Sequence, residues 1–99
     1  MMNVRNMQSE RSGRDVANQF IITDGSKTMF QSYNSPIVEI DRENKTITVY
    51  PDWNYSVTTR KYRNQFMHNE GFSAMASTKD FERCMNEGEI RGFKIVKTF

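Results

Sequence analysis

The sequence predicts an α+β domain: an antiparallel sheet of four or five strands connected as a meander, with two helices in the C-terminal half. The composition is the first indication. Leucine is absent, and the apolar residues are mainly Phe, Met, Ile and Val, which favour strands over a helical bundle. The patterning is the second, because short β-like segments fill the first half and helical periodicity follows. A chain of 99 residues has room for one domain.

The N-terminal residues 1–15 are polar and show no hydrophobic periodicity. We expect them to form a flexible tail, with residues 16–99 as the single α+β domain. The first twenty residues contain no apolar leader, and Cys84 has no second cysteine for a disulfide. These features predict a protein of the cytoplasm.

The strands are predicted from alternating apolar residues and the turns between them. Asp24-Gly25 follows the apolar residues 20–22 and is a strong hairpin signal, because Gly tolerates positive φ. Pro36 is expected to separate two strands, because proline cannot donate to a strand ladder. Residues 93–99 alternate in part and are the candidate fifth strand. The four expected strands are 18–24, 27–33, 37–40 and 46–50.

The first helix is predicted over residues 56–68, with Ser56, Thr58 or Thr59 as the candidate cap. Thr59, Tyr62 and Phe66 share one face at spacings of three and four, which predicts the buried side. Gly71 is the expected residue after the helix end.

The second helix is predicted from Ser77-Thr78-Lys79-Asp80, which matches a capping box, to about Glu87. Phe81, Cys84 and Met85 recur at helical spacing and predict its buried face. Gly88 follows as a helix terminator.

The residue types needed for catalysis do not form a recognisable constellation. His68 and Cys84 are the only members of their types and lie on different predicted helices. Neither a nucleophile–base pair nor a set of metal ligands follows from the spacing, and the five glycines do not form a phosphate-binding pattern. We therefore expect a protein that is not an enzyme, with no catalytic residues, metal or cofactor.

The segment from Trp53 to Phe66 carries the candidate binding residues. Its part 56–68 holds three cations and no acid, which suits phosphate contacts and base stacking. The alternative is that its aromatic residues are core and its cations are a solvated face. Trp53 and Tyr55 are likewise either interface anchors or a loop closing over the core. The candidates are Arg60, Lys61, Arg63, Asn64, Trp53 and Tyr55.

Two stretches resemble a family of small uncharacterised proteins encoded largely by bacteriophages and prophages. They are FQSYNS at residues 30–35 and WNYSVTTRKYRNQF at residues 53–66, preceded by QFI at residues 19–21. Asn54 stands where the family pattern has Asp, which puts in doubt any role that needs a carboxylate there. The resemblance spans residues 18–67 and implies a phage setting, with no catalytic residues to carry over.

The resemblance implies an accessory protein that binds and inhibits a bacterial host or defence protein, for example a defence nuclease such as a CRISPR effector. An anti-CRISPR-like inhibitor is therefore the first expectation, with the basic helix face of Arg60, Lys61 and Arg63 as its contact. A small nucleic-acid-binding module is the alternative. We expect no membrane association, and both a monomer and a homodimer remain open.

Overall fold

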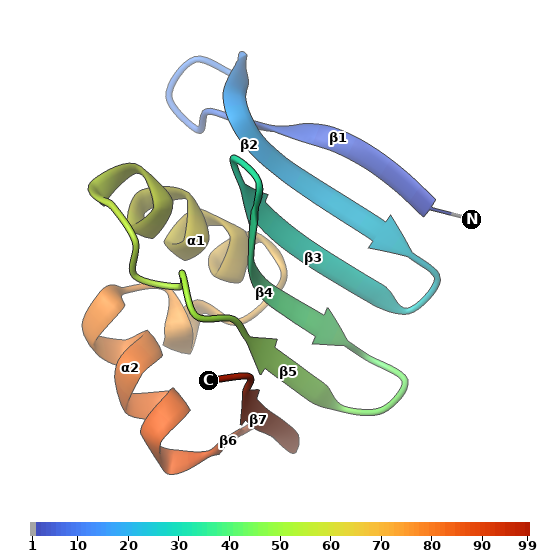
Figure 1. Cartoon of the computed structure of the whole chain (residues 1–99), viewed down its shortest axis with the longest axis vertical. Coiled ribbons are helices and arrows are strands. Elements are labelled where there is room, and N and C mark those ends of the chain that lie inside the picture. The colour runs from blue at the N-terminus through green and yellow to red at the C-terminus, as the bar shows by residue number, and fades with distance from the viewer. Residues whose placement is uncertain (1) are drawn as a thin grey trace.

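The computed structural model describes residues 2–99 and shows a seven-stranded sheet with its helices packed against one face (Figure 1). Two α-helices and one short 3-10 helix follow the fifth strand along the chain. The elements are β1 (Met2–Gln8), β2 (Asp15–Asp24), β3 (Lys27–Ser32), β4 (Ser35–Asp41), β5 (Thr46–Val49), α1 (Val57–Asn69), η1 (Ser73–Met75), α2 (Thr78–Glu87), β6 (Glu89–Ile90) and β7 (Phe93–Lys97).

The strands lie in the order β1-β2-β3-β4-β5-β7-β6. Strands β1 to β5 form an antiparallel meander, whereas β7 pairs parallel with β5 and antiparallel with β6. A parallel pair needs a long crossover, which α1, η1 and α2 provide here. The α+β class and the two C-terminal helices agree with the prediction. The sheet is mixed and larger than the predicted four or five strands.

The N-terminal segment differs most from expectation, because residues 2–8 form β1 instead of part of a flexible tail. Val4 lies opposite Ile22 in the antiparallel pair with β2, and Met7 is buried at the end of the strand. An edge strand exposed over most of its length carries little hydrophobic alternation, so periodicity did not reveal it. Met1, the first residue of the expected tail, lies outside the described residues.

Pro36 lies within β4, although we expected it to separate two strands. Phe30 pairs with Val38 and Gln31 with Pro36, so the register shifts by one residue between the two pairs. Such a bulge locally interrupts the ladder, and proline is tolerated there. The additional residue, Ile37, is fully buried.

Both helices begin and end close to the predicted residues. Ser56 caps α1 by accepting a hydrogen bond from the backbone of Thr59 (3.1 Å), and Ser77 caps α2 in the same way. Gly71 follows α1 with φ of +93° and Gly88 follows α2 with φ of +80°. These left-handed conformations favour glycine, which explains why both helices stop there.

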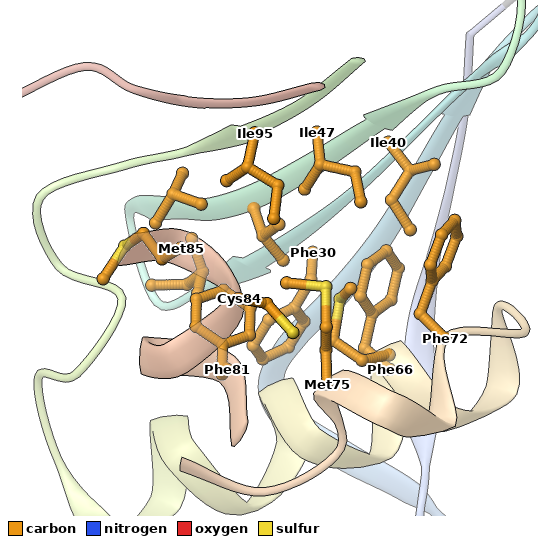
Figure 2. Packing of buried hydrophobic residues seen from close by; sticks show 14 of the residues in the cluster. Phe30, Ile40, Ile47, Phe66, Phe72, Met75, Phe81, Cys84, Met85 and Ile95 are labelled. Atoms are coloured by element: carbon orange, nitrogen blue, oxygen red, sulfur yellow. The ribbon is translucent and has the colours of Figure 1, made fainter. Parts of the chain in front are cut away.

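The core lies between the sheet and the helices (Figure 2). The rings of Phe30 on β3 and Phe66 on α1 stack with centroids 5.8 Å apart. Phe81 and Cys84 on α2 are buried in the same cluster, as their helical spacing predicted. Large aromatic and sulfur-containing side chains thus fill the space that leucine usually occupies.

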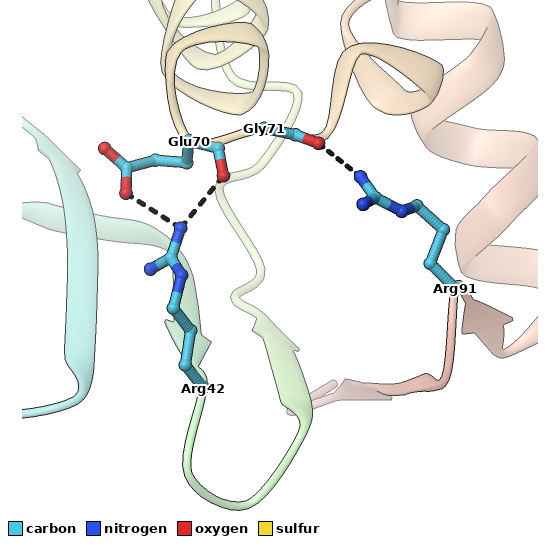
Figure 3. A network of polar contacts seen from close by, with 4 residues as sticks. All are labelled: Arg42, Glu70, Gly71 and Arg91. Carbon is cyan, nitrogen blue, oxygen red and sulfur yellow. Dashed lines mark hydrogen bonds and ion pairs between the residues drawn. The ribbon is translucent and has the colours of Figure 1, made fainter.

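The C-terminal end of α1 is tied to two turns of the sheet by arginines (Figure 3). The Arg42 guanidinium donates to the Glu70 carbonyl (2.9 Å) and pairs with its carboxylate (3.1 Å). Arg91 donates to the Gly71 carbonyl at 2.6 Å. Cations suit the carbonyls at a helix C-terminus, so these contacts help to hold α1 in place on the sheet.

Candidate interaction site

The six candidate residues divide into a buried group and an exposed group. Trp53 is partly buried and packs against the core, with its ring stacked on Phe81 at 5.6 Å and 17°. Arg63 is fully buried. Tyr55 and Lys61 are exposed, while Arg60 and Asn64 are partly buried. The structure therefore assigns Trp53 and Arg63 to packing inside the fold, which the sequence had left open for Trp53.

Arg63 joins three parts of the chain. Its guanidinium donates to the Trp53 carbonyl (2.7 Å), the Thr78 hydroxyl (2.8 Å) and the Asn64 amide oxygen (2.9 Å). Its central carbon lies 4.6 Å from the ring centroid of Phe81, in cation–π geometry. Within residues 2–99 these partners are neutral. Arg63 is thus a clamp between the loop before α1, α1 itself and the start of α2.

The environment of Arg63 lowers the pKa of its guanidinium. Burial, with a smaller contribution from the nearby charge of Arg60, lowers the pKa of Arg63 to about 10. The side chain is still a cation at neutral pH, and it is shielded from solvent. The sequence predicts a basic contact face of Arg60, Lys61 and Arg63, and the structure leaves only Arg60 and Lys61 on the outside of α1.

The outer face of α1 borders a shallow hollow of about 560 Å³. Lys61, Asn64 and His68 line it from the helix, and Glu10 and Arg11 line it from the turn between β1 and β2. Its lining therefore has two basic side chains, Arg11 and Lys61, and one carboxylate, Glu10. This outer hollow is basic but not strongly so.

A second hollow lies at the N-terminal end of α1, and we call it the N-terminal hollow. Its volume is about 650 Å³. Tyr55 is 71% exposed and Tyr33 is 50% exposed, and both line it. Val57, in the first turn of α1, is 72% exposed. The other lining residues are Ser32, Asn34, Ser35, Ile37, Asp52, Ser56, Thr58 and Thr59.

The floor of the N-terminal hollow is held by a chain of hydroxyl groups. The Ser56 hydroxyl donates to the Thr59 hydroxyl at 3.1 Å, and the Thr59 and Ser32 hydroxyls lie 3.0 Å apart. Thr59 is fully buried and Ser32 nearly so. These bonds join β3 directly to the first turn of α1, so the hollow has a rigid base.

Sequence reasoning identified Tyr55 but missed Tyr33, Asn34 and Ser35, which line the same hollow. They were interpreted as turn residues after a strand, and nothing in their local pattern indicates a contact with residues 52–59. One feature of the sequence could have indicated this contact: residues 30–35 and 53–66 are the two stretches that carry the family resemblance. The structure brings these stretches together at the N-terminal hollow.

The only His and the only Cys of the sequence lie apart, as their positions on different helices predicted. Cys84 is buried in the core, with its thiol 3.9 Å from the Ala74 carbonyl. His68 is exposed near the end of α1. In the described part of the chain, residues 2–99, no helix has the length and apolar character to cross a membrane.

Fold and surface together define a small α+β protein with an aromatic-rimmed hollow at the start of its first helix. The chain belongs to a family of unknown function, DUF8033, whose sequence profile matches residues 2–83. That match includes β1 and all the residues that line the N-terminal hollow, and it ends within α2. Searches of curated proteins and of solved structures found no match.

Proposed function

We propose that this protein binds and inhibits a bacterial host or defence protein, as a non-catalytic accessory protein of the kind that phages encode. The N-terminal hollow is the proposed contact. The observation that carries the proposal is the exposure of Tyr33 and Tyr55 on one concave surface, with Val57 exposed in the adjoining first turn of α1. Tyrosine is enriched among the residues that dominate protein–protein binding, because it offers a large apolar ring and a polar end.

The backbone around the N-terminal hollow supports a preformed site. Tyr33 has a left-handed backbone (φ of +55°), and its N–H donates to the Asn18 carbonyl at 2.6 Å. The N–H of Tyr55 donates to the Asp52 carbonyl at 3.1 Å, within the loop that Arg63 holds through Trp53. Side chains on a fixed backbone lose less entropy on binding. A partner would meet both tyrosines near their bound positions.

The phage setting rests on the resemblance. The two stretches that carry it, residues 30–35 and 53–66, both supply residues that line the N-terminal hollow. A target in the bacterial cytoplasm, such as a CRISPR effector or another defence nuclease, follows from that setting.

A nucleic acid is the second candidate partner, favoured by the cations Arg11 and Lys61, which both line the outer hollow. Its support is weaker than the sequence indicated. Tyr62 and Phe66 are buried in the core, so they are not free to stack on bases. Arg63 is buried as well. What remains is a weak basic surface without an exposed aromatic platform.

The proposal is tested by affinity capture from a bacterial lysate, with and without nuclease treatment, followed by binding of the purified target. A Tyr33→Ala/Tyr55→Ala variant is compared with Arg60→Ala/Lys61→Ala, which changes only the outer side of α1. We expect a defined protein to be retained after nuclease treatment. Its affinity falls at least tenfold with the tyrosine variant and less than threefold with the basic-face variant, because interface anchors contribute about 1–2 kcal/mol or more.

Two results would overturn the proposal. Recovery that disappears with nuclease, with an affinity that falls steeply between about 50 and 200 mM salt, assigns the protein to nucleic-acid binding. Retention of a protein whose affinity depends on Arg60 and Lys61 but not on the tyrosines removes the N-terminal hollow as the contact.

A further inference from the structure

Strand β1 presents a long, open edge of the sheet, with Arg5 as its one charged residue. It is the outermost strand beside β2, and its first four residues, 2–5, are all exposed. Natural edge strands are usually shortened, bulged or marked by proline or charged residues, because their free N–H and C=O groups can pair with another strand. The opposite edge follows this rule, since β6 has only two residues. β1 has seven residues, and its bulge comes only after Asn6.

We propose that the β1 edge binds a second copy of this chain, through antiparallel pairing of β1 with β1 about a twofold axis at Val4. The regular part of β1 runs from Met2 to Asn6, before the register shift between Asn6 and Gln8. Val4 is the centre of these five residues. An axis at Val4 therefore pairs all five residues with the second copy: Val4 lies opposite Val4, Asn3 opposite Arg5, and Met2 opposite Asn6.

The charges of the strand favour the same axis. Arg5 is the only charged residue of β1. An axis at Arg5 would place two arginines directly opposite each other, and like charges in that position are destabilising. With the axis at Val4, each Arg5 lies opposite the neutral amide of Asn3 in the other copy.

On the open face of the sheet, the pairing would join a row of apolar side chains from each copy. Val4, Ile22 and Met29 are successive cross-strand partners and so share one face, the one opposite the buried Ile21 and Phe30. Two copies paired at Val4 join their apolar rows into one continuous row. The helices lie on the other face, so each copy keeps its N-terminal hollow free. The dimer is inferred from β1 alone and does not depend on the proposed function.

Disulfide cross-linking tests the axis directly. Directly opposed residues of an antiparallel pair have Cβ atoms about 4.5–5.5 Å apart, close to the range that a disulfide bridges. In a Cys84→Ala background, Val4→Cys is expected to form a covalent dimer on mild oxidation. Asn3→Cys and Arg5→Cys are the matched single controls. Each should cross-link weakly alone and efficiently when the two proteins are mixed.

Charge substitutions at Asn3 give a second measurement that leaves β1 intact. Sedimentation over a concentration series gives the dimer dissociation constant for the unmodified chain and the variants. Asn3→Glu faces Arg5 of the other copy twice per dimer, so the constant is expected to fall about 2- to 30-fold. Asn3→Lys should raise it by a similar factor. Asn3 is exposed, so both variants should fold as the parent does, which circular dichroism checks.

The proposal is overturned if the unmodified chain is monomeric at every concentration and Val4→Cys does not cross-link. It is also overturned if a dimer forms whose dissociation constant is the same for Asn3→Glu and Asn3→Lys. Binding of an extended segment of another protein to β1 of a monomeric chain would likewise replace the second copy as the occupant.

Discussion

Replacing the buried Arg63 by alanine should strongly destabilise the fold, although the sequence places this residue among the candidates of a basic contact face. The substitution removes the donors to the Trp53 carbonyl and the Thr78 hydroxyl, at 2.7 and 2.8 Å. It also leaves a void beside Phe81, over which the guanidinium lies. The loop before α1 and the start of α2 would then lose their common partner.

The expected loss follows from these contacts. Each hydrogen bond to a charged group contributes about 1.5–3 kcal/mol. Removal of the buried charge, which has no carboxylate partner among residues 2–99, offsets part of that loss. We expect the free energy of unfolding to fall by about 3 kcal/mol. For a domain of this size that corresponds to a decrease in Tm of roughly 12–24 °C.

Thermal unfolding followed by circular dichroism and Trp53 fluorescence measures this change. Lys61→Ala, on the exposed side of the same helix, is the matched control and should stay within about 0.5 kcal/mol of the parent. Arg63→Met keeps much of the side-chain volume against Phe81 and should recover part of the loss. A Tm for Arg63→Ala within about 3 °C of the parent would refute the clamp.

Three further predictions concern turns and caps. Hydrogen bonds from Asn44 lower the pKa of Asp41, so its stabilising effect is present above its ordinary pKa and is lost as the pH falls through the lowered value. Denaturant unfolding between pH 5 and 2 should lose stability more steeply for the parent than for Asp41→Asn, and equal slopes would contradict this. Gly88→Ala should cost about 1–2 kcal/mol through strain alone, because nothing lies within 4 Å of the added Cβ; an unchanged Tm would exclude strain there. Ser56→Ala should lower the free energy of unfolding by about 1 kcal/mol, because it removes the acceptor for the Thr59 N–H. Ser56→Thr should retain most of the parent's stability, because its hydroxyl can accept the same bond.

Local signals in the sequence predicted much of the secondary structure. The hairpin at Asp24-Gly25, the cap Ser77 and the terminators Gly71 and Gly88 all lie where the structure has them, and Ser56 is one of the three positions predicted for the first cap. Each depends on the conformation or hydrogen bonding of a few neighbouring residues, so a short window of sequence contains the information. The buried faces of the two helices follow from spacing for the same reason.

The candidate site was predicted less completely. Tyr55 and Lys61 are exposed as a contact requires, and Arg63 is buried. A helical wheel places Arg63 at the border of the apolar face and does not show which neighbours cover it. Trp53 and Phe81 come from a loop and from another helix, so only their packing decides that Arg63 lies inside.

The sequence by itself determined the α+β class, the meander of β2 to β5, the two helices and their ends, because these depend on turn chemistry, capping and periodicity over a few residues. Only the tertiary structure decided that residues 2–8 join the sheet, that β7 inserts parallel to β5, and that residues 30–35 meet residues 52–59 around the N-terminal hollow. These features are pairings between segments distant in sequence. Their stability depends on surfaces that exist only once the core between sheet and helices has formed.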